Sequence, residues 1–241
     1  MPAGSKRTKK ETRPTSRRAK RESQAALPFP SRGGWPKGKR RKPAGEAGVP
    51  HVVRERLTGR EPVHVTLKLL PGLPRLRDRR TDAALRAAFA AGCDRSGFRM
   101  AHYSVQNDHL HMICEAPERA SFARGVQGLT IRVARALNKL WGRKGKVFAD
   151  RYHDHVLRSP REVRNALRYV LQNAAKHGRQ FADGLDRFAS GAWFDGWRES
   201  FNVKNLPEVT PVARARTWLL TKGWRKHGLL SLLEAPKGAP G

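Results

Sequence analysis

Apolar and polar residues alternate along three segments between residues 60 and 120. Residues 63–69, 98–106 and 109–115 follow a period of two, which predicts half-buried β-strands. Asn107-Asp108 is a turn signal between the second and third segments, so we expect these two strands to form a hairpin. Between the first strand and the hairpin, the Ala- and Arg-rich residues 82–97 predict a helix that ends at a glycine.

Two further helices, with a strand between them, are predicted after residue 116. From Phe122 to Leu140 the apolar residues recur at steps of four and three, which predicts one long helix. Residues 147–157 predict a fourth strand. The sequence Ser159-Pro160-Arg161-Glu162 has serine at the N-cap, proline at the first helical position and glutamate at the third. This capping box predicts a helix that ends at Gly178.

The order of these elements predicts the fold class. Strand–helix–strand–strand–helix–strand–helix is typical of an α+β fold with a ferredoxin-like (RRM-like) antiparallel sheet and helices on one face. We expect three parts in the chain: a basic disordered arm over residues 1–60, a folded domain over 61–178, and a loop and helix extension over 179–241.

Charge narrows the class of partner. The 241 residues contain 50 Lys and Arg against 20 Asp and Glu, a formal net charge of +30. This excess excludes an ordinary metabolic enzyme surface and indicates a polyanionic partner. The first fifty residues hold 15 Lys and Arg against 3 Asp and Glu and few aliphatic residues, which predicts a disordered arm. Its run Arg40-Arg41-Lys42 is interpreted as part of a tail that binds phosphates without sequence preference.

Several other classes of protein are excluded. No apolar run approaches the ~20 residues of a membrane helix, so we expect no membrane span. The basic N-terminus lacks the apolar core of a secretory signal. Cys93 and Cys114 are too few for a disulfide framework or a four-cysteine zinc site, which favours reduced thiols. The starting expectation is an intracellular nucleic-acid protein.

Two histidines form the first candidate site. In the predicted strand His109-Leu110-His111 the period of two puts both imidazoles on one face and Leu110 on the other. Adjacent imidazoles are able to bind one divalent ion. The alternative is two polar residues on a solvated sheet face, and the strand by itself does not decide between these interpretations.

The last predicted helix adds a tyrosine and an amide. At 100° per residue its apolar positions fall in one arc, which contains Val163, Leu167, Val170, Leu171 and Ala174. Tyr169 lies roughly 145° from the centre of that arc, with Asn173 one turn further on. Packing therefore does not explain Tyr169, which is either a surface aromatic or a functional residue. Its phenol is suited to attack a phosphate, and the Asn173 amide oxygen is suited to a metal.

At these residues the sequence resembles a known family. Gln106-Asn107-Asp108-His109-Leu110-His111, followed by Tyr169-Val170-Leu171-Gln172-Asn173, resembles the single-tyrosine transposases of the HUH endonuclease superfamily. The more specific resemblance is to the branch associated with repetitive extragenic palindromes, which the block 147–155 also resembles. The resemblance covers residues 62–178. Members often have Asn-Pro after the tyrosine, whereas Asn173-Ala174 stands here, which lets the helix run on to Gly178.

The resemblance implies an activity and a set of roles. His109, His111 and Asn173 would bind Mg²⁺ or Mn²⁺, and Tyr169 would attack single-stranded DNA to form a 5′-phosphotyrosine. The chain would then be a DNA-nicking and rejoining transposase that acts near hairpin DNA. We expect single-stranded or hairpin DNA as partner, a monomer or homodimer, and a cytoplasmic, nucleoid-associated location. The expected DNA-backbone contacts are Arg124, Arg132, Arg135 and Lys139 on the long helix, Lys176, and Arg40, Arg41 and Lys42.

Two other functions remain open. A non-catalytic RRM-like module would stack bases on aromatic residues of its central strands, but no Lys/Arg-Gly-Phe-type motif is found and Tyr103 is the lone candidate. A domesticated, inactive relative would bind hairpins without cutting them. Among the remaining residues, His64 could line the same site, His153 and His155 favour a structural strand pair, and Tyr152 is either a base-stacking or a packing residue.

Overall fold

The computed structural model describes residues 54–95, 97–176, 185–200 and 209–234. The predicted basic run Arg40-Arg41-Lys42 lies outside these ranges. Lys176 ends a described helix, but its side chain is also outside the described part. Within the described ranges, no helix is long and apolar enough to cross a lipid bilayer.

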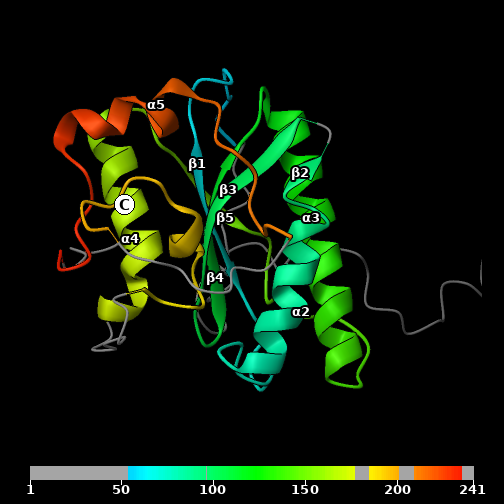
Figure 1. Cartoon of the computed structure of the whole chain (residues 1–241). Coiled ribbons are helices and arrows are strands. Elements are labelled where there is room, and N and C mark those ends of the chain that lie inside the picture. The colour runs from blue at the N-terminus through cyan, green and yellow to red at the C-terminus, as the bar shows by residue number, and fades with distance from the viewer. Residues whose placement is uncertain (1–53, 96, 177–184, 201–208, 235–241) are drawn as a thin grey trace, which may run out of the picture. The chain divides into compact units, whose positions relative to one another are not determined.

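A five-stranded antiparallel sheet forms the centre of the described body, which confirms the predicted α+β class (Figure 1). The strands are β1 (Val63–Lys68), β2 (Asp94–Arg95), β3 (Phe98–Val105), β4 (His109–Glu115) and β5 (His153–Val156). Their order across the sheet is β2-β3-β4-β1-β5, and every neighbouring pair is antiparallel. The predicted hairpin is therefore present as β3 and β4, at the middle of the sheet.

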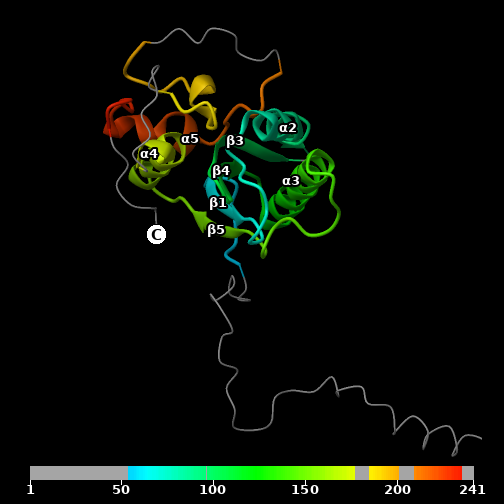
Figure 2. The same ribbon diagram turned by 90° about the horizontal axis from the view of Figure 1, so that it is seen from below.

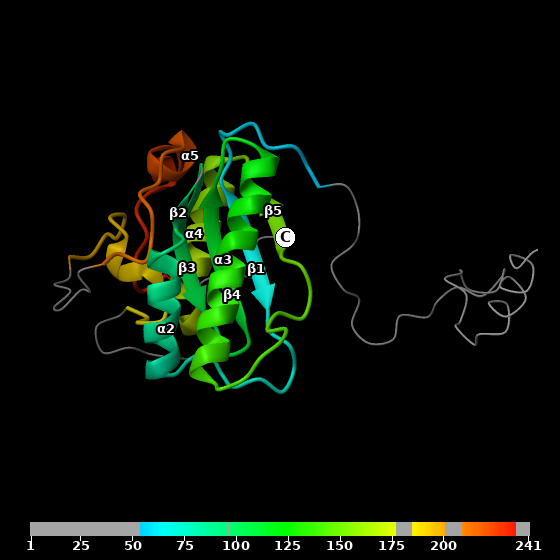
Figure 3. The same cartoon turned by 90° about the vertical axis from the view of Figure 1, so that its right-hand side faces the viewer.

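Two helices, α2 (Arg79–Ala90) and α3 (Arg119–Leu140), cover one face of the sheet (Figures 1 and 3). The stripe predicted for the long helix is buried there from Phe122 to Leu137, packed with Val65 and Met112 of the central strands. Alternate residues of each strand point to this face, as a period of two requires. The two helices and the sheet thus enclose the larger core of the body.

The other face carries a layer that the prediction of helices on one face did not include. Helix α4 (Pro160–Lys176) lies there, together with the short helices η1 (Ser190–Trp193), α5 (Trp218–Thr221) and η2 (Gly223–His227) (Figure 2). Val163, Leu167 and Val170 of α4 form a second core with Trp224 of η2 and Ile113 of β4. The apolar arc of α4 is too wide for the sheet alone, so the later segments bury the remainder.

Local signals explain the element boundaries. The capping box is confirmed, since Ser159 N–H donates to Glu162 Oε2 at 3.0 Å and Glu162 N–H donates to Ser159 Oγ at 3.2 Å. Helix α2 begins before the predicted residue 82, because the Asp78 carboxylate accepts from the N–H groups of Arg80 and Thr81. It also ends earlier, at Ala90, and the strand predicted over 147–157 is shortened to β5.

Residues 54–60 belong to the folded body, although they fall within the predicted arm. Leu57 is buried in the larger core. Arg54 forms an ion pair with Asp154 at 2.9 Å and lies over the ring of Tyr152. Ordered structure therefore begins before residue 61.

Candidate active site

Histidines from three adjacent strands share the sheet face that α4 covers. Thr66 on β1 lies opposite His111 on β4 and opposite His153 on β5. His64, two residues before Thr66, lies opposite His155. Because side chains in register point to the same face, the predicted pair His109 and His111 is joined by three further imidazoles. His64 thus lies where the sequence suggested, and His153 and His155 form the expected pair on the edge strand.

His111 stands at the centre of this cluster and is 4% exposed. Its Nδ1 lies 3.2 Å from Nε2 of His64 and 3.2 Å from Oγ1 of Thr66. Burial, with smaller contributions from His155 and His153, lowers the pKa of His64 to about 4, so His64 is neutral near pH 7. When Nδ1 of His111 carries the proton and donates to one of these neighbours, the lone pair of its Nε2 faces α4.

His109 is oriented by the residue before it. Its Nδ1 lies 2.7 Å from Oδ1 of Asp108, and this hydrogen bond lowers the pKa of the Asp108 carboxyl. A carboxylate bound to one ring nitrogen fixes the tautomer and leaves Nε2 as a ligand atom. The ring centroids of His109 and His111 are 4.7 Å apart. The turn residue Asp108 therefore also orients the first histidine, a role that the sequence prediction missed.

Tyr169 reaches the histidine cluster from α4. Its phenol oxygen lies 3.5 Å from Nε2 of His111, and the two ring centroids are 5.0 Å apart at a steep angle. The interpretation of Tyr169 as a surface aromatic is wrong, because the residue is only 8% exposed. Tyr169 lies in the second core with residues of the sheet and of the segments after residue 185, whereas Asn165, one turn earlier, is exposed.

The other two tyrosines of the chain lie on the α2–α3 side. Tyr103 is buried against Phe89, with ring centroids 4.7 Å apart. Tyr152 packs against Phe122 beneath the Arg54 guanidinium, which lies 3.5 Å from its ring centroid. The packing interpretation of Tyr152 is confirmed, and it is not placed to replace Tyr169 as a nucleophile.

Asn173 has an unusual environment for an amide. It follows Gln172, whose non-helical backbone angles (φ −118°, ψ 15°) kink the helix. The Asn173 side chain is 1% exposed, and neither Oδ1 nor Nδ2 has a hydrogen-bond partner among the described residues. An unsatisfied buried amide costs about 1–3 kcal/mol, so a group that occupies it is favoured. A divalent cation at the Oδ1 atom, one turn after Tyr169, would supply that interaction.

By donor chemistry, the side chains of His109, His111 and Asn173 would suit a divalent ion. Two imidazole nitrogens and one amide oxygen would leave positions open on the ion for water or phosphate oxygens. Among the described side chains, no three His, Cys, Asp or Glu residues form a group suited to a metal. If the Asn173 amide joined the two histidines, the set would have three protein ligands. Because imidazole is a softer ligand than carboxylate, such a set would favour Mn²⁺ over Mg²⁺.

The predicted DNA-backbone residues of α3 lie on the far side of the sheet from Tyr169 (Figure 3). Arg124, Arg135 and Lys139 are exposed. Arg132 is half-buried and donates from NH1 to the Gly128 carbonyl at 3.0 Å. The structure brings the histidines and Tyr169 together, but it does not bring these four basic side chains to them.

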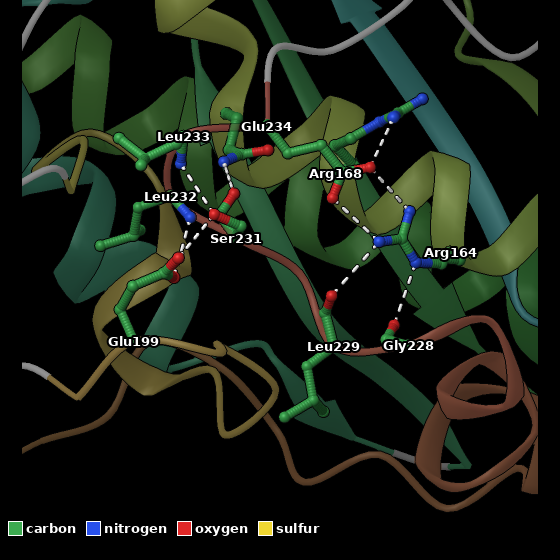
Figure 4. Close-up of polar contacts among 10 residues, drawn as sticks. Arg164, Arg168, Glu199, Gly228, Leu229, Ser231, Leu232, Leu233 and Glu234 are labelled. Carbon is green, nitrogen blue, oxygen red and sulfur yellow. Dashed lines mark hydrogen bonds and ion pairs between the residues drawn. The ribbon is translucent and has the colours of Figure 1, made fainter.

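Residues 228–234 hold α4 in place, a contact that the sequence did not predict (Figure 4). Arg164 donates to the Gly228 and Leu229 carbonyls at 3.0 and 3.2 Å. Arg164 and Arg168 both bind the Glu234 carboxylate at 2.8 Å. One turn on, Gln172 Nε2 donates to the Ser231 carbonyl at 2.7 Å. Polar side chains at spacings of four lie on one helix face, and here Arg164, Arg168 and Gln172 bind the strap of residues 228–234 along that face of α4.

The strap leads to a stability prediction. Glu234→Gln is expected to lower the free energy of unfolding by on the order of 1 kcal/mol, because two arginines lose their carboxylate at a partly exposed site. The hydrogen bonds from Arg164, then Arg168, lower the pKa of Glu234 from 4.5 to about 2. A lowered carboxyl pKa adds stability that is complete above pH 4.5 and is lost as pH falls towards 2.

Urea unfolding of both proteins at pH 7 and pH 3 measures this effect. The difference between wild type and Glu234→Gln is expected to shrink at the lower pH. Glu118→Gln is a suitable control and should change stability little at either pH, because this exposed carboxylate precedes α3 and does not contact α4. Equal effects of Glu234→Gln on the free energy of unfolding at both pH values would contradict the assignment of the lowered pKa of Glu234 to its arginine contacts.

The fold and the site together define an α+β protein in which a histidine pair on a central strand faces a tyrosine on a helix. Residues 74–174 match the family described as "Transposase IS200 like", and this range includes both histidines, Tyr169 and Asn173. The match spans fewer than half of the 241 residues, and over this range it confirms the resemblance predicted from the sequence.

Individual relatives agree with this family. Over 103 residues the chain is 24% identical to a protein of Haemophilus influenzae (strain ATCC 51907 / DSM 11121 / KW20 / Rd) described as a REP-associated tyrosine transposase. The match covers 39% of this chain and 58% of that protein.

Two solved structures are also similar. A REP-associated tyrosine transposase bound to a REP hairpin has 18% identity and a TM-score of 0.49, covering 70% of this chain and 99% of its own. A transposase described from Deinococcus radiodurans R1 has 15% identity and a TM-score of 0.34, covering 46% and 85%.

Proposed function

We propose that this chain is a metal-dependent single-stranded DNA endonuclease and strand-transferase that cuts near hairpin DNA through a 5′-phosphotyrosine. The observation that carries the proposal is the position of Tyr169. Of three tyrosines, it is the one whose phenol meets the strand histidines, 3.5 Å from His111 Nε2. The match of residues 74–174 to a transposase family and the predominance of basic residues support DNA as the substrate.

The proposed reaction conserves the number of phosphodiester bonds. The Tyr169 oxygen forms a bond to the scissile phosphorus as its phenolic proton leaves. The bond from phosphorus to the 3′ oxygen breaks, and that oxygen takes a proton and leaves as a hydroxyl. In the reverse direction another 3′-hydroxyl attacks the phosphotyrosine and releases the phenol. No nucleotide cofactor is required, because the phosphotyrosine retains the bond energy.

His109, His111 and Asn173 would hold the divalent ion. When bound, the ion supplies charge stabilisation to the phosphate oxygens. The chain's own contribution is orientation: Asp108 fixes the His109 ring, and His64 with Thr66 fixes the His111 ring. The Nε2 atom of a neutral His111 has a single lone pair. If that lone pair binds the ion, Nε2 does not also accept the phenolic proton of Tyr169.

The hairpin preference and the location are part of the same proposal. The relative from Haemophilus influenzae is described as associated with REP sequences, which form palindromes, and we extend this substrate class to the present chain. The basic residues 1–50 and the exposed basic side chains of α3 would hold DNA outside the cleaved segment. A DNA-bound protein of this kind would reside with the nucleoid in the cytoplasm.

A covalent-capture assay tests the proposal. The full chain is incubated with end-labelled hairpins that carry single-stranded flanks, with Mn²⁺, Mg²⁺ or a chelator. We expect a labelled band that survives denaturation, requires the metal and disappears on protease treatment. Hairpin binding without any such band across the panel would instead favour the inactive, DNA-binding relative.

The basic arm leads to a second prediction for DNA binding. Deleting residues 1–50, which hold 15 Lys and Arg, is expected to weaken binding to all sequences. The log–log salt dependence should flatten by about 0.7–0.9 units for each lost phosphate contact. Fluorescence anisotropy across a salt series measures both quantities. Replacing Arg40, Arg41 and Lys42 by Gln should give a part of the same change. If the deletion altered the sequence preference and left the slope of the salt dependence unchanged, the arm would recognise a specific DNA sequence, which would contradict this prediction.

A further inference from the structure

A buried ion pair lies beside the β3–β4 turn, and the proposed reaction does not use it. Arg77 NH1 donates to Asp186 Oδ2 at 2.8 Å, and Arg77 NH2 donates to Asp186 Oδ1 at 2.7 Å. The two side chains are only 3% and 2% exposed. Removing two charges from water offsets most of their attraction, so a buried pair adds little stability compared with apolar side chains of similar volume. What the pair does supply is a fixed geometry.

Arg77 holds the turn that leads into β4. Its NH1 also donates to the carbonyl of Val105, the last residue of β3, at 2.8 Å. Two backbone N–H groups of the same segment between β1 and α2 bind the turn as well. Leu69 and Leu76 donate to the carbonyls of residues 108 and 107, at 2.7 and 2.9 Å. One segment therefore binds the turn and the strand end before it at three carbonyls.

The turn carries the group that orients the first histidine of the site. Asp108 is its last residue, and the Asp108 carboxylate lies 2.7 Å from Nδ1 of His109. The Asp108 side chain is 63% exposed, so the backbone that carries it, rather than side-chain packing, decides where the carboxylate lies. The oriented groups of a binding site have to be held within about 0.5 Å. A shifted turn would therefore move the carboxylate away from the His109 ring.

Asp186 connects this turn to the segment that follows α4 in the chain. Its carboxylate accepts from the Phe188 N–H at 3.0 Å, and the Phe188 ring centroid lies 4.4 Å from the Arg77 guanidinium. The Phe188 carbonyl in turn accepts from the Val105 N–H at 2.8 Å. Residues 186–189 thus lie along the end of β3, where they also form a bridge with the strand. The ion pair joins the turn, the segment before α2 and the segment after α4.

We propose that Arg77 and Asp186 are positioning residues for the candidate active site. Their pair fixes the β3–β4 turn, and with it the Asp108 carboxylate and the His109 ring, to the segment that follows α4. A guanidinium and a carboxylate joined at two points adopt one relative orientation, whereas an apolar contact permits sliding. The consequence for metal binding rests on the proposed function, but the consequence for the His109 ring does not.

Replacing both charges separates positioning from stability. The double variant Arg77→Met, Asp186→Leu keeps apolar volume in place of the pair, and its melting temperature should stay within about 4 °C of wild type. The first readout is the tautomer of His109 in the metal-free full chain at about pH 8.5, where imidazole is neutral. Long-range ¹H–¹⁵N spectra report it, with the signal assigned from a His109→Gln variant. We expect the wild-type ring to carry its proton on Nδ1, facing Asp108, and the double variant to show both tautomers.

Mn²⁺ binding is the second readout, measured from the EPR signal of the free ion. The double variant should bind Mn²⁺ about tenfold more weakly, a loss typical of groups that support a metal ligand. Arg77→Lys keeps the charge but loses the two-point contact, so it should fold and show a smaller change in both readouts. The control variant Arg225→Met, Asp195→Leu removes a more exposed ion pair of 2.8 Å and should change neither readout.

A folded double variant whose His109 tautomer is that of wild type would overturn the proposal. A wild-type His109 that carries its proton on Nε2 would also overturn it. If the double variant does not fold, Arg77→Lys decides in its place, and an unchanged His109 ring in that variant would be the contradicting result. If the wild-type protein binds no Mn²⁺, the proposed function fails, whereas the His109 tautomer still tests the positioning role.

Discussion

Tyr169→Phe is expected to eliminate the covalent protein–DNA adduct and to reduce strand cleavage by at least about 10³-fold. The change removes one oxygen and keeps the ring, so packing against His111 and His64 is retained. Because the hydroxyl is buried 3.5 Å from His111 rather than exposed, we expect a stability loss of up to about 1.5 kcal/mol. Denaturing gels measure the adduct, and anisotropy measures hairpin affinity, which should stay within about threefold of wild type.

Tyr152→Phe is the matched control for this variant. It also removes one phenolic oxygen from a largely covered tyrosine, but on the opposite face of the sheet. Its adduct yield should equal that of wild type. An adduct that persists in Tyr169→Phe and disappears in Tyr152→Phe would reverse the assignment of the nucleophile.

Loss of either strand histidine is expected to have the second-largest effect. His109→Ala and His111→Ala should each reduce cleavage by more than about 100-fold, since losing a residue that only supports a metal ligand already costs about 10–100-fold. The two variants should differ in stability. His111 is buried beside His64 and Thr66, so its loss should cost about 1–3 kcal/mol, whereas the partly exposed His109 should cost less than about 1 kcal/mol.

Further variants separate metal binding from packing. Asn173→Ala should be milder than either histidine variant, because water replaces a neutral ligand, and it should raise the Mn²⁺ concentration that gives half-maximal cleavage. His153→Ala, an exposed histidine on the same sheet face, serves as the control and should leave cleavage unchanged. An Asn173→Ala protein with an unaltered Mn²⁺ requirement would remove this amide from the site.

The sequence predicts the central sheet and the histidine pair because both depend on local periodicity. Alternation over 109–115 is enough to put His109 and His111 on one face, and a four-residue capping box is enough to begin α4. The burial of Tyr169 depends instead on residues far along the chain. A helical-wheel projection of α4 does not reveal that residues 228–234 bind Arg164 and Arg168 and so cover the polar side of the helix.

The rest of the site also depends on contacts between distant parts of the chain, which local periodicity does not predict. His64 becomes a neighbour of His111 only when β1 pairs with β4, a contact across 47 residues of chain. The kink at Gln172 and the unsatisfied amide of Asn173 also arise from tertiary packing, since the uninterrupted helical pattern of the sequence gives no sign of either. Periodicity predicts faces, but strand order and long-range contacts decide which faces meet.

Mapping the adduct by mass spectrometry tests the central proposal most directly. The full chain would be incubated with Mn²⁺ and a hairpin with single-stranded flanks, then digested with protease and nuclease. The account predicts one modified peptide from α4 that carries a nucleotide phosphate on Tyr169. A modified peptide that contains Tyr152, Tyr103 or a serine, with Tyr169 unmodified, would contradict it.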